Sequence, residues 1–535
     1  MCDALIIKTK EMNYLIKIFF VVITTTFLTG CSKDLLETVP NDRISTEIYW
    51  KTDKDATLAS NAVYTYLEGV SIFSWDGMSD IGHTNIPFAV NAVVERGQMD
   101  IQNGIVLNEW QDDYAGIRSA NAFLANVDKV KTTDKDRIER LKGEVKTLRA
   151  YLYIKLASLF GDVPLVTTEI TLEESRNVAR TPVAQIWDFI SGELTDAATV
   201  LPNTQTDKGR ITKGAALALK ARAMLYAGRY SEAAEAAKQV MDSKVYSLYP
   251  SYQNLFSYAA ENNKEVILDK EFVKDTYRNN AFGYMAPYSQ QASSSTFVPL
   301  KKLVDSYQMT NGKDIADPTS GFDPHDPYKD RDPRLEYSIF TLGDQLPDGK
   351  IYNSKPASAT ADAVGFTYLA TTTGFNVKKY INKEDLGQPG NCGINIILIR
   401  YAEVLLTYAE AKIEANQIDQ SVVDAINEVR QRPDVNMPPI AIGSQEEMRN
   451  IVRHERVVEL AFEGLRYIDI RRWKIAENVI PGKLYGMTYT DENGTLQTIQ
   501  IQSFEKTFDK SRDYLWPIPQ KERDLNPNLT QNPNW

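Results

Sequence analysis

The sequence predicts a mainly helical (all-α) protein built from antiparallel helical hairpins, with long irregular loops and only minor β elements. Apolar residues recur at helical spacing on both sides of Gly228 within residues 212–243, which indicates two helices joined by a turn. Similar periodicity near residues 114–159, 183–200 and 396–430 gives three more candidate hairpins. Gly, Pro, Ser and Asp accumulate between these segments, as is typical of loops.

The hairpin over residues 212–243 has the features of a tetratricopeptide-like repeat. Alanines occupy facing positions in both helices, and their small side chains let the two backbones approach closely. Gly228 accepts the backbone angles that end the first helix. The run Tyr-Ala-Gly-Arg-Tyr at 226–230, followed by spaced alanines, approximates the repeat signature. Because one hairpin cannot bury its apolar face alone, we expect the other hairpins to pack beside it.

Apolar periodicity and the residues that typically begin or end helices predict the remaining helices and strands along the chain. We expect helices over about 53–67, 110–124, 134–159, 181–201, 396–411, 422–429 and 446–462, a short strand at 265–268, and an extended, proline-punctuated tail from Tyr514. The stretches 69–104 and 246–398 show weaker periodicity. Long loops of this kind inside a compact body are usually functional.

The N-terminal residues predict export. From Met12, taken as the start of translation, a short segment with Lys17 leads into an apolar run that ends at Leu28. The run is too short for a comfortable membrane span but suits the core of a signal peptide. Its ending, Leu-Thr-Gly-Cys31, resembles the bacterial lipobox, in which the cysteine is acylated and becomes the mature N-terminus. Residues 1–30 are therefore predicted to be a signal peptide; the alternatives are a plain secretory peptide and an N-terminal anchor helix.

Composition and charge narrow the class of protein. The 535 residues are 43% hydrophobic and carry a formal net charge of −11. This acidic balance argues against a nucleic-acid-binding surface, which requires clustered cations. Cys2 falls within the predicted signal peptide, which leaves Cys392 without an intrachain partner, and we expect no disulfide framework.

No motif nominates a catalytic, cofactor or metal site. The three histidines lie outside metal motifs, and neither a G-x-S-x-G elbow nor a Gly-rich phosphate loop occurs. The acidic run from Asp317 to Arg334 lacks the ligand spacing of a calcium loop and is predicted to form turns. The cations Arg466, Arg471 and Arg472 alternate with acidic residues, so ion pairs are predicted rather than a basic patch.

Several blocks together resemble the SusD/RagB family of outer-membrane lipoproteins of Bacteroidetes. They occur in the family's order behind the lipobox: Cys31-Ser-Lys-Asp-Leu-Leu-Glu37, the W-x3-Y-x2-I-x3-N pattern from Trp110 to Asn121, Leu148-Arg-Ala-Tyr151 with Phe160-Gly-Asp-Val-Pro-Leu165, Gly209 to Tyr226, Asp332-Pro-Arg334, Arg400-Tyr-Ala-Glu403, Phe462-Glu-Gly-Leu-Arg466 with Arg471-Arg-Trp473, and Gln531-Asn-Pro-Asn534. The resemblance covers nearly all of residues 31–535, with an N-terminal part at 31–245 and a C-terminal part at 246–535.

This resemblance implies a fold and a function. The fold is helical, around four tetratricopeptide-like units whose loops form the ligand face. The function is capture of oligosaccharides at the cell surface and their delivery to a SusC-like TonB-dependent transporter, without catalysis and without a cofactor or metal. The protein would be anchored to the outer membrane through a lipid on Cys31. A peptide-binding uptake receptor and an extracellular glycan-degrading enzyme are the alternatives.

Two irregular stretches offer the side chains that a sugar site needs, namely aromatic faces for the C–H surface of the sugar and polar groups for its hydroxyls. The candidate ligand residues are Phe73, Trp75 and Asp80 in the first stretch, and Tyr277, Arg278, Tyr284 and Tyr288 in the second. Trp75 and Tyr284 are the leading candidates. The alternative for each aromatic residue is packing within its loop, whereas Trp110, Trp187, Trp473 and Trp516 lie in structural blocks and are expected in the core.

Overall fold

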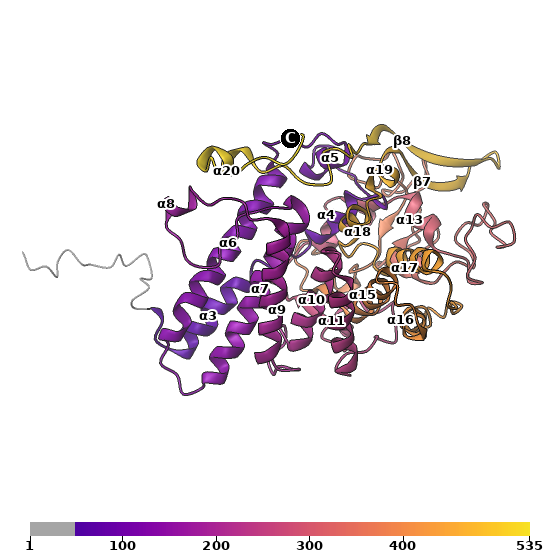
Figure 1. The fold of residues 1–535 in the computed structure, drawn as a ribbon. Helices are drawn as coiled ribbons and strands as arrows, with labels where there is room; N and C mark the ends of the chain where they lie inside the picture. The colour runs from indigo at the N-terminus through magenta and orange to yellow at the C-terminus, as the bar shows by residue number, and fades with distance from the viewer. Residues whose placement is uncertain (1–48) are drawn as a thin grey trace, which may run out of the picture.

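The computed structural model describes residues 49–535, and most of its regular structure is helical (Figure 1). The longer helices are α3 (Asp53–Tyr64), α6 (Gly104–Asn126), α7 (Lys135–Phe160), α9 (Val183–Val200), α10 (Lys213–Tyr226), α11 (Tyr230–Asp242), α15 (Tyr401–Glu414), α16 (Gln420–Arg430) and α17 (Gln445–Glu459). The short α-helices are α4 (Ile72–Gly77), α5 (Val90–Glu95), α8 (Leu172–Ser175), α12 (Ala281–Met285), α13 (Lys301–Ser306), α14 (Arg334–Ser338), α18 (Arg466–Arg472), α19 (Ala476–Val479) and α20 (Gln520–Leu525).

The long helices form one continuous layer in which neighbours in sequence are neighbours in space. Helix α6 packs on α7, α7 on α9, α9 on α10, α10 on α11, α11 on α15, and α15 on α16 and α17 (Figure 1). This order confirms the mainly helical fold. Residues 183–200, expected as a hairpin, are instead the single helix α9, which continues through Gly192 without a break.

The α10–α11 hairpin shows why alanine suits the faces between helices. Ala215, Ala223, Ala233 and Ala237 are completely buried, so the two helices approach with little side-chain bulk between them. Gly228 has a positive φ of 72°, and the amide that follows it bonds back to the carbonyl of Met224 at 2.8 Å. The glycine therefore ends α10 as the sequence predicted.

The strands form four antiparallel pairs within the described chain: β1 (Gly82–Thr84) with β3 (Phe297–Pro299), β2 (Val266–Lys270) with β6 (Ile396–Arg400), β4 (Ile339–Phe340) with β5 (Asn376–Val377), and β7 (Gly482–Thr490) with β8 (Leu496–Lys506). The strand expected at 265–268 is confirmed as β2. The prediction that a helix starts at residue 396 is wrong. Residues 396–400 form β6, which pairs with β2, and α15 begins only at Tyr401.

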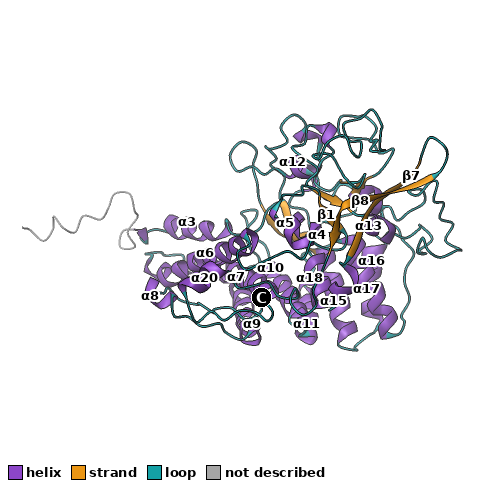
Figure 2. Ribbon diagram, turned by 90° about the horizontal axis from the view of Figure 1, so that it is seen from above, coloured by secondary structure: helices purple, strands orange, loops and turns teal. Residues whose placement is uncertain are grey.

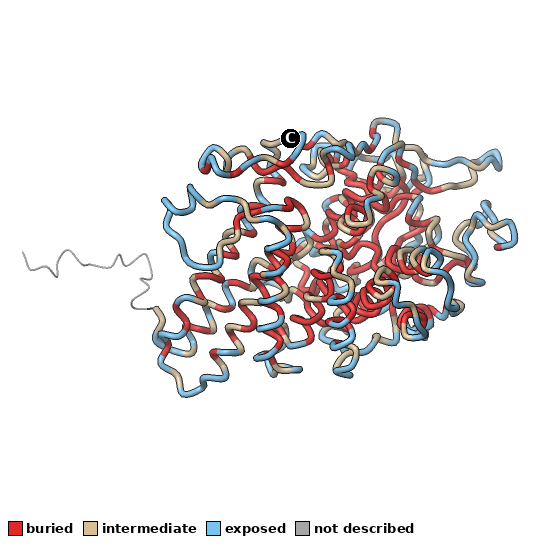
Figure 3. Tube along the Cα trace, viewed as in Figure 1, coloured by how far each residue is buried: buried red, intermediate tan, exposed pale blue. Residues whose placement is uncertain are grey.

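The small strands and long loops gather on one side of the helical layer. Figure 2 shows α12, β1 and the loops around them above the helices, and Figure 3 shows buried residues in the middle of the molecule and exposed ones along its outer loops and helix ends. The C-terminal tail runs along the layer and contains α20, a helix that was not expected in an extended tail. Trp516 in this tail is completely buried, as expected, and its amide donates to the carbonyl of Leu159 at 2.8 Å.

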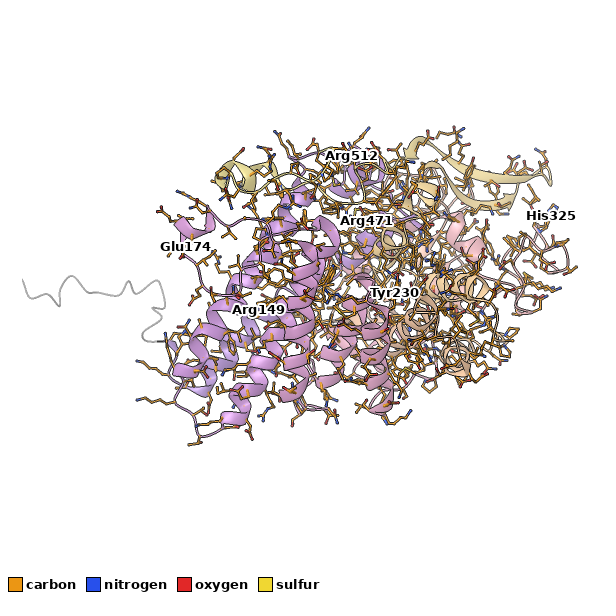
Figure 4. The ribbon with its side chains drawn as sticks, in the orientation of Figure 1. Arg149, Glu174, Tyr230, His325, Arg471 and Arg512 are labelled. Atoms are coloured by element: carbon orange, nitrogen blue, oxygen red, sulfur yellow. The ribbon has the colours of Figure 1, made fainter. Side chains whose placement is uncertain are left out.

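Polar side chains connect helices within the layer. Arg149 on α7 lies inside it (Figure 4) and donates to Glu193 on α9 at 2.9 Å and to Asn121 on α6 at 2.5 Å. These bonds fix three consecutive helices relative to one another. No helix within residues 49–535 has both the length and the hydropathy needed to cross a membrane.

A buried network of charges joins the end of the helical layer to the strands. Its members are five cations, Arg334, Lys379, Arg400, Arg430 and Arg432, and five carboxylates, Glu265, Asp332, Glu455, Glu459 and Glu463. Glu459 lies at its centre and accepts from Arg334, Arg400 and Arg432 at 2.7 to 2.9 Å. Burial alone would raise the pKa of Glu459, but these three guanidinium groups hold it well below its usual value.

We predict that Glu459→Gln destabilises the protein by about 3–5 kcal/mol, because it removes the one carboxylate that three buried guanidinium groups share and leaves the network with an excess of positive charge. Chemical denaturation followed by circular dichroism measures this loss. Asp242→Asn is the control, because Asp242 forms only an exposed pair with Lys238 and its loss is expected to change stability by less than about 1 kcal/mol. Equal stability of the two variants would contradict the central role of Glu459.

Candidate functional site

Three segments that are far apart in sequence converge on the loop face. Strand β1 pairs with β3, and directly after β1 the Asn85 amide donates to the carbonyl of Thr296 at 2.8 Å. The side chain of Asn85 is buried; its Nδ2 donates to the carbonyl of Ala370 at 2.7 Å, and its Oδ1 accepts from the amide of Thr372 at 3.0 Å. Asn85 therefore joins the loops that carry residues 85–90 and 366–372.

These joined loops expose a group of large aromatic side chains. Phe88 is 75% exposed, Phe366 60% and Tyr368 59%. The rings of Phe88 and Tyr368 contact each other with centroids 6.1 Å apart and planes 60° apart. We call Phe88, Phe366 and Tyr368 the aromatic patch. Isolated apolar residues are common on protein surfaces, but grouped, exposed rings in converging loops are typical of an interaction site.

A buried cluster of ion pairs stabilises the loop that contains Phe88. Glu95, at the end of α5, contacts Nδ1 of His83 at 2.8 Å and Nζ of Lys506 on β8 at 3.0 Å, and it accepts from the amide of Thr84 at 2.8 Å. Burial alone would raise the pKa of Glu95, but Lys506 and His83 lower it to about 2. Both ends of the Phe88 loop, at Asn85 and at Glu95, are thus tied to the interior.

The first stretch of expected ligand residues lies inside the protein, which corrects the expectation that its side chains face a ligand. Phe73 is completely buried, and its ring lies 5.5 Å from that of Tyr380. Trp75, a leading candidate, stacks against Tyr467 with centroids 5.9 Å apart and donates from Nε1 to Glu68 at 2.8 Å. The alternative of packing within the loop describes both aromatic residues, because α4 buries its whole length.

Asp80 has a structural partner rather than a free carboxylate. It accepts from Arg466 at 2.7 and 2.9 Å and pairs with Lys302 at 2.8 Å. Burial alone would raise the pKa of Asp80, but these two cations hold it well below its usual value. The predicted ion pairing of Arg466 is confirmed, as is that of Arg472, which binds Glu410 at 2.6 Å. The prediction is wrong for Arg471, which donates instead to the backbone carbonyl of Tyr514 at 2.6 Å.

The candidate ligand residues of the second stretch lie at two separate places on the protein. Tyr284 on α12 and Tyr288 are partly buried near the converging loops, where the carbonyl of Tyr284 accepts from the amide of Thr296 at 2.7 Å. Tyr277 and Arg278 are exposed on another segment, next to the bridge between Asn279 and Cys392. The structure therefore brings the chain around Tyr284 close to Asn85 but does not bring Trp75 to the same surface.

The sequence analysis missed all three residues of the aromatic patch. Phe88 lies within the irregular stretch 69–104, directly after Pro87, and the only available signal was an aromatic residue in a loop that also contains several glycines. Phe366 and Tyr368 lie in the long segment 246–398, where the sequence has little periodicity. Exposure depends on contacts between distant segments, so no local pattern separates Phe88 from the buried Phe73.

The remaining titratable residues form no cluster suited to a metal ion in the described chain. No group of three or more His, Cys, Asp or Glu side chains within residues 49–535 is arranged to hold a metal ion. His325 lies at the tip of an outer loop (Figure 4), where Asp323 and Asp317 accept from backbone amides in the turns expected there. Cys392 is free and buried, and burial raises its pKa to about 12, as expected for an unreactive thiol.

Comparison with known families matches this architecture in two parts. The model described as "SusD family" matches residues 264–535, and the model described as "Starch-binding associating with outer membrane" matches residues 46–225. The chain belongs to the SusD family. The fold predicted from the resemblance is confirmed.

Individual relatives align over nearly the whole chain. A SusD-like carbohydrate-binding protein from Bacteroides fragilis has a crystal structure that is 30% identical in sequence, covers 90% of this chain and 100% of its own, and superposes with a TM-score of 0.83. A second SusD-like protein from the same species is 26% identical over 93% of this chain and 100% of its own, with a TM-score of 0.81. SusD-like protein P2 from Formosa agariphila is 28% identical over 96% of this chain and 98% of its own.

We predict that Glu95→Gln destabilises the protein by about 3 kcal/mol at pH 7, because the native pKa of Glu95 is lowered from about 4.5 to about 2. A lowered carboxylate pKa stabilises the fold above the unfolded-state value, and this contribution is lost as the pH falls from about 4.5 toward 2. The stability difference between the variant and the wild-type protein should shrink over that range. Denaturant titrations at pH 7, 5, 4 and 3 measure it.

Glu505→Gln is the matched control for this pH series. Glu505 is the exposed neighbour of Lys506 on β8, and its replacement is expected to leave stability nearly unchanged at every pH. A stability loss for Glu95→Gln that stays constant down to pH 3 would show that the stabilisation does not come from the negative charge of Glu95.

Proposed function

We propose that this protein binds oligosaccharides at the cell surface through the aromatic patch. The observation that carries the proposal is the contact between the exposed rings of Phe88 and Tyr368 in loops that Asn85 holds together. Two rings inclined at 60° offer faces of different orientation, which matches a chain of sugar rings better than a single flat ligand. The C–H face of each sugar packs on a ring, while nearby polar groups receive its hydroxyls.

The rigidity of the supporting loops favours binding. Ordering a loop upon binding costs free energy, and loops already held in place avoid this cost. Here Asn85 bonds to both neighbouring segments, and the Arg96 guanidinium donates to the carbonyl of Pro87 at 3.2 Å. The backbone beside Phe88 is thus fixed before a ligand arrives, and the ligand needs to order only side chains.

The similarity to a carbohydrate-binding protein supports the same ligand class. The Bacteroides fragilis protein that carries this description shares 30% identity and aligns over its full length. Membership of the SusD family and the family description that links starch binding to the outer membrane support a location at that membrane. We propose that the protein acts without catalysis and passes captured glycan to a SusC-like TonB-dependent transporter.

Anchoring to the membrane would come from the predicted lipid on Cys31, which lies outside the described residues. A cysteine that carries several acyl chains gives stable membrane attachment. The helix α3 begins at Asp53, about twenty residues after Cys31.

We predict that Phe88→Ala and Tyr368→Ala each weaken oligosaccharide binding about tenfold or more, because stacking on an aromatic ring contributes about 1–1.5 kcal/mol beyond burial. Thermal stability should change little, since both side chains are largely exposed. Calorimetric titration of residues 32–535 against a panel of plant, host and microbial oligosaccharides and a peptide mixture measures both the ligand class and the loss.

Tyr485→Ala is the matched control, because Tyr485 is an exposed aromatic residue on β7, outside the aromatic patch. It should leave the affinity for a neutral glycan unchanged. Heat with peptides alone would assign the protein to the peptide-binding branch, and release of reducing ends would indicate a glycan-degrading enzyme. Unchanged glycan affinity in Phe88→Ala and Tyr368→Ala would exclude the aromatic patch as the binding site.

We predict that Cys31→Ser abolishes labelling with a radioactive fatty acid and moves the protein from the membrane fraction to the soluble fraction. Cys392→Ser is the matched control, since this thiol is completely buried and its replacement should leave labelling unchanged. Cell fractionation and autoradiography measure both. Fatty-acid labelling that persists in Cys31→Ser would contradict the lipobox.

A further inference from the structure

A second cleft lies on the protein between the end of α3, the loop before α10, and strand β2. Its volume is about 470 Å³, within the range of small-ligand pockets. The residues that define its chemistry are Tyr64, Arg210, Asp269, Lys270, Glu271 and Tyr277. None of the residues that line it belongs to the aromatic patch, so the cleft is a separate place on the surface.

One wall of the cleft is aromatic and held in place. The ring of Tyr277 stacks on Phe272 with centroids 5.3 Å apart and planes only 12° apart. Tyr277 is nevertheless 46% exposed, because Phe272 covers only one of its faces. The other face remains open to a ligand with a flat apolar side or a positive charge.

The cations of the cleft already have protein partners. Arg210 donates to Glu144 at 2.8 Å and to Asn61 at 2.8 Å. Lys270 donates to the carbonyls of Thr65 and Leu67 at 3.0 and 2.6 Å. Arg210 is therefore already paired with a carboxylate, and two of the three Nζ donors of Lys270 are used by backbone carbonyls.

The carboxylates of the cleft are in the opposite situation. Within residues 49–535, neither Asp269 nor Glu271 has a cationic side chain within 4.0 Å, although Lys208 lies near Glu271 at the rim. Asp269 is buried, and its Oδ2 accepts from Asn395 at 3.2 Å. Burial, followed by the charge of Glu271, raises the pKa of Asp269 to about 7, although the hydrogen bond from Asn395 acts in the opposite direction.

We propose that this cleft binds a hydroxylated amine of the amino-sugar class. The ammonium group would pair with Glu271 and Asp269, and the apolar face of the sugar would lie on the open face of Tyr277. A cation fits here because it supplies the missing counter-charge, whereas an anion would add to the charge of two carboxylates. This site is independent of the aromatic patch and of the neutral glycans proposed for it.

Calorimetric titration with three probes tests the proposal: a β-1,4-linked glucosamine tetramer, its fully N-acetylated counterpart, and a glucose tetramer of the same linkage. Acetylation removes the positive charge and keeps the sugar backbone. We expect saturable binding of the glucosamine tetramer, with an affinity at least about tenfold higher than that of either uncharged tetramer, because a charge-assisted hydrogen bond is roughly twice as strong as a neutral one.

Variants locate the binding. Glu271→Gln and Tyr277→Ala should each weaken binding of the glucosamine tetramer about tenfold, whereas the difference in affinity between the charged and the acetylated tetramer should persist in Phe88→Ala. Asp275→Asn is the matched control, because Asp275 is an exposed carboxylate two residues from Tyr277 that does not line the cleft. Melting curves identify any variant that fails to fold, and Glu271 is only partly buried, so Glu271→Gln should remain folded.

Three results would overturn the proposal. They are a lack of binding by the wild-type protein, equal affinity for the charged and the acetylated tetramer, and full binding by Glu271→Gln. Loss of binding in Phe88→Ala instead would place the amino sugar on the aromatic patch and leave the cleft without a ligand. The failure of this proposal would not affect the proposed function, since that function is tested by the effect of Phe88→Ala and Tyr368→Ala on the affinity for neutral glycans.

Discussion

The buried ion pairs around Glu459 are the constraint on which the loop face depends. Burying ten charged groups is unfavourable unless each finds a partner, because desolvation costs several kcal/mol per ion. The network satisfies this condition with equal numbers of cations and carboxylates, in which Glu459 binds three arginines. Its members come from β2, β6, α14, α16 and α17 and from the segments beside them, so these elements can adopt only one mutual arrangement. Apolar packing of the same elements would allow them to slide.

The same network reaches the loop face through a short segment after α17. Glu463 pairs with Arg400 and Lys379, and the next amide, that of Gly464, donates to Asp76 at 2.8 Å. Gly464 has a φ of 83°, and a Cβ there would lie 3.0 Å from the carbonyl oxygen of Ile72, so the close approach requires glycine. Two residues further on, Arg466 binds Asp80. The C-terminal half thus positions the loop that leads into β1 and on to Phe88.

This arrangement explains which parts of the site the sequence could predict. The helices followed from apolar periodicity and from end signals such as Gly228, because helix formation depends on near neighbours. Residues 396–400 were misassigned because Ile-Ile-Leu-Ile fits a buried helix as well as a buried strand, and only pairing with β2 decides. Trp75 and Phe88 are aromatic residues in the same irregular stretch, yet one is buried against Tyr467 and the other is exposed. Their difference arises from contacts with residues hundreds of positions away.

The aromatic patch is difficult to predict for a further reason, which follows from how it is held. Its loops are fixed by Asn85, which bonds to backbone groups, and by Glu95, which bonds beneath the surface; neither contact depends on the ring at position 88 or 368. Exposed rings add little to folding stability, so the fold tolerates many side chains there. The second cleft differs, because Asp269 and Lys270 belong to β2 and Arg210 holds Glu144. Changes in that cleft affect packing as well as binding. A loop surface free to vary suits ligands that differ between relatives, whereas a cleft built from structural residues suits a ligand of fixed chemistry.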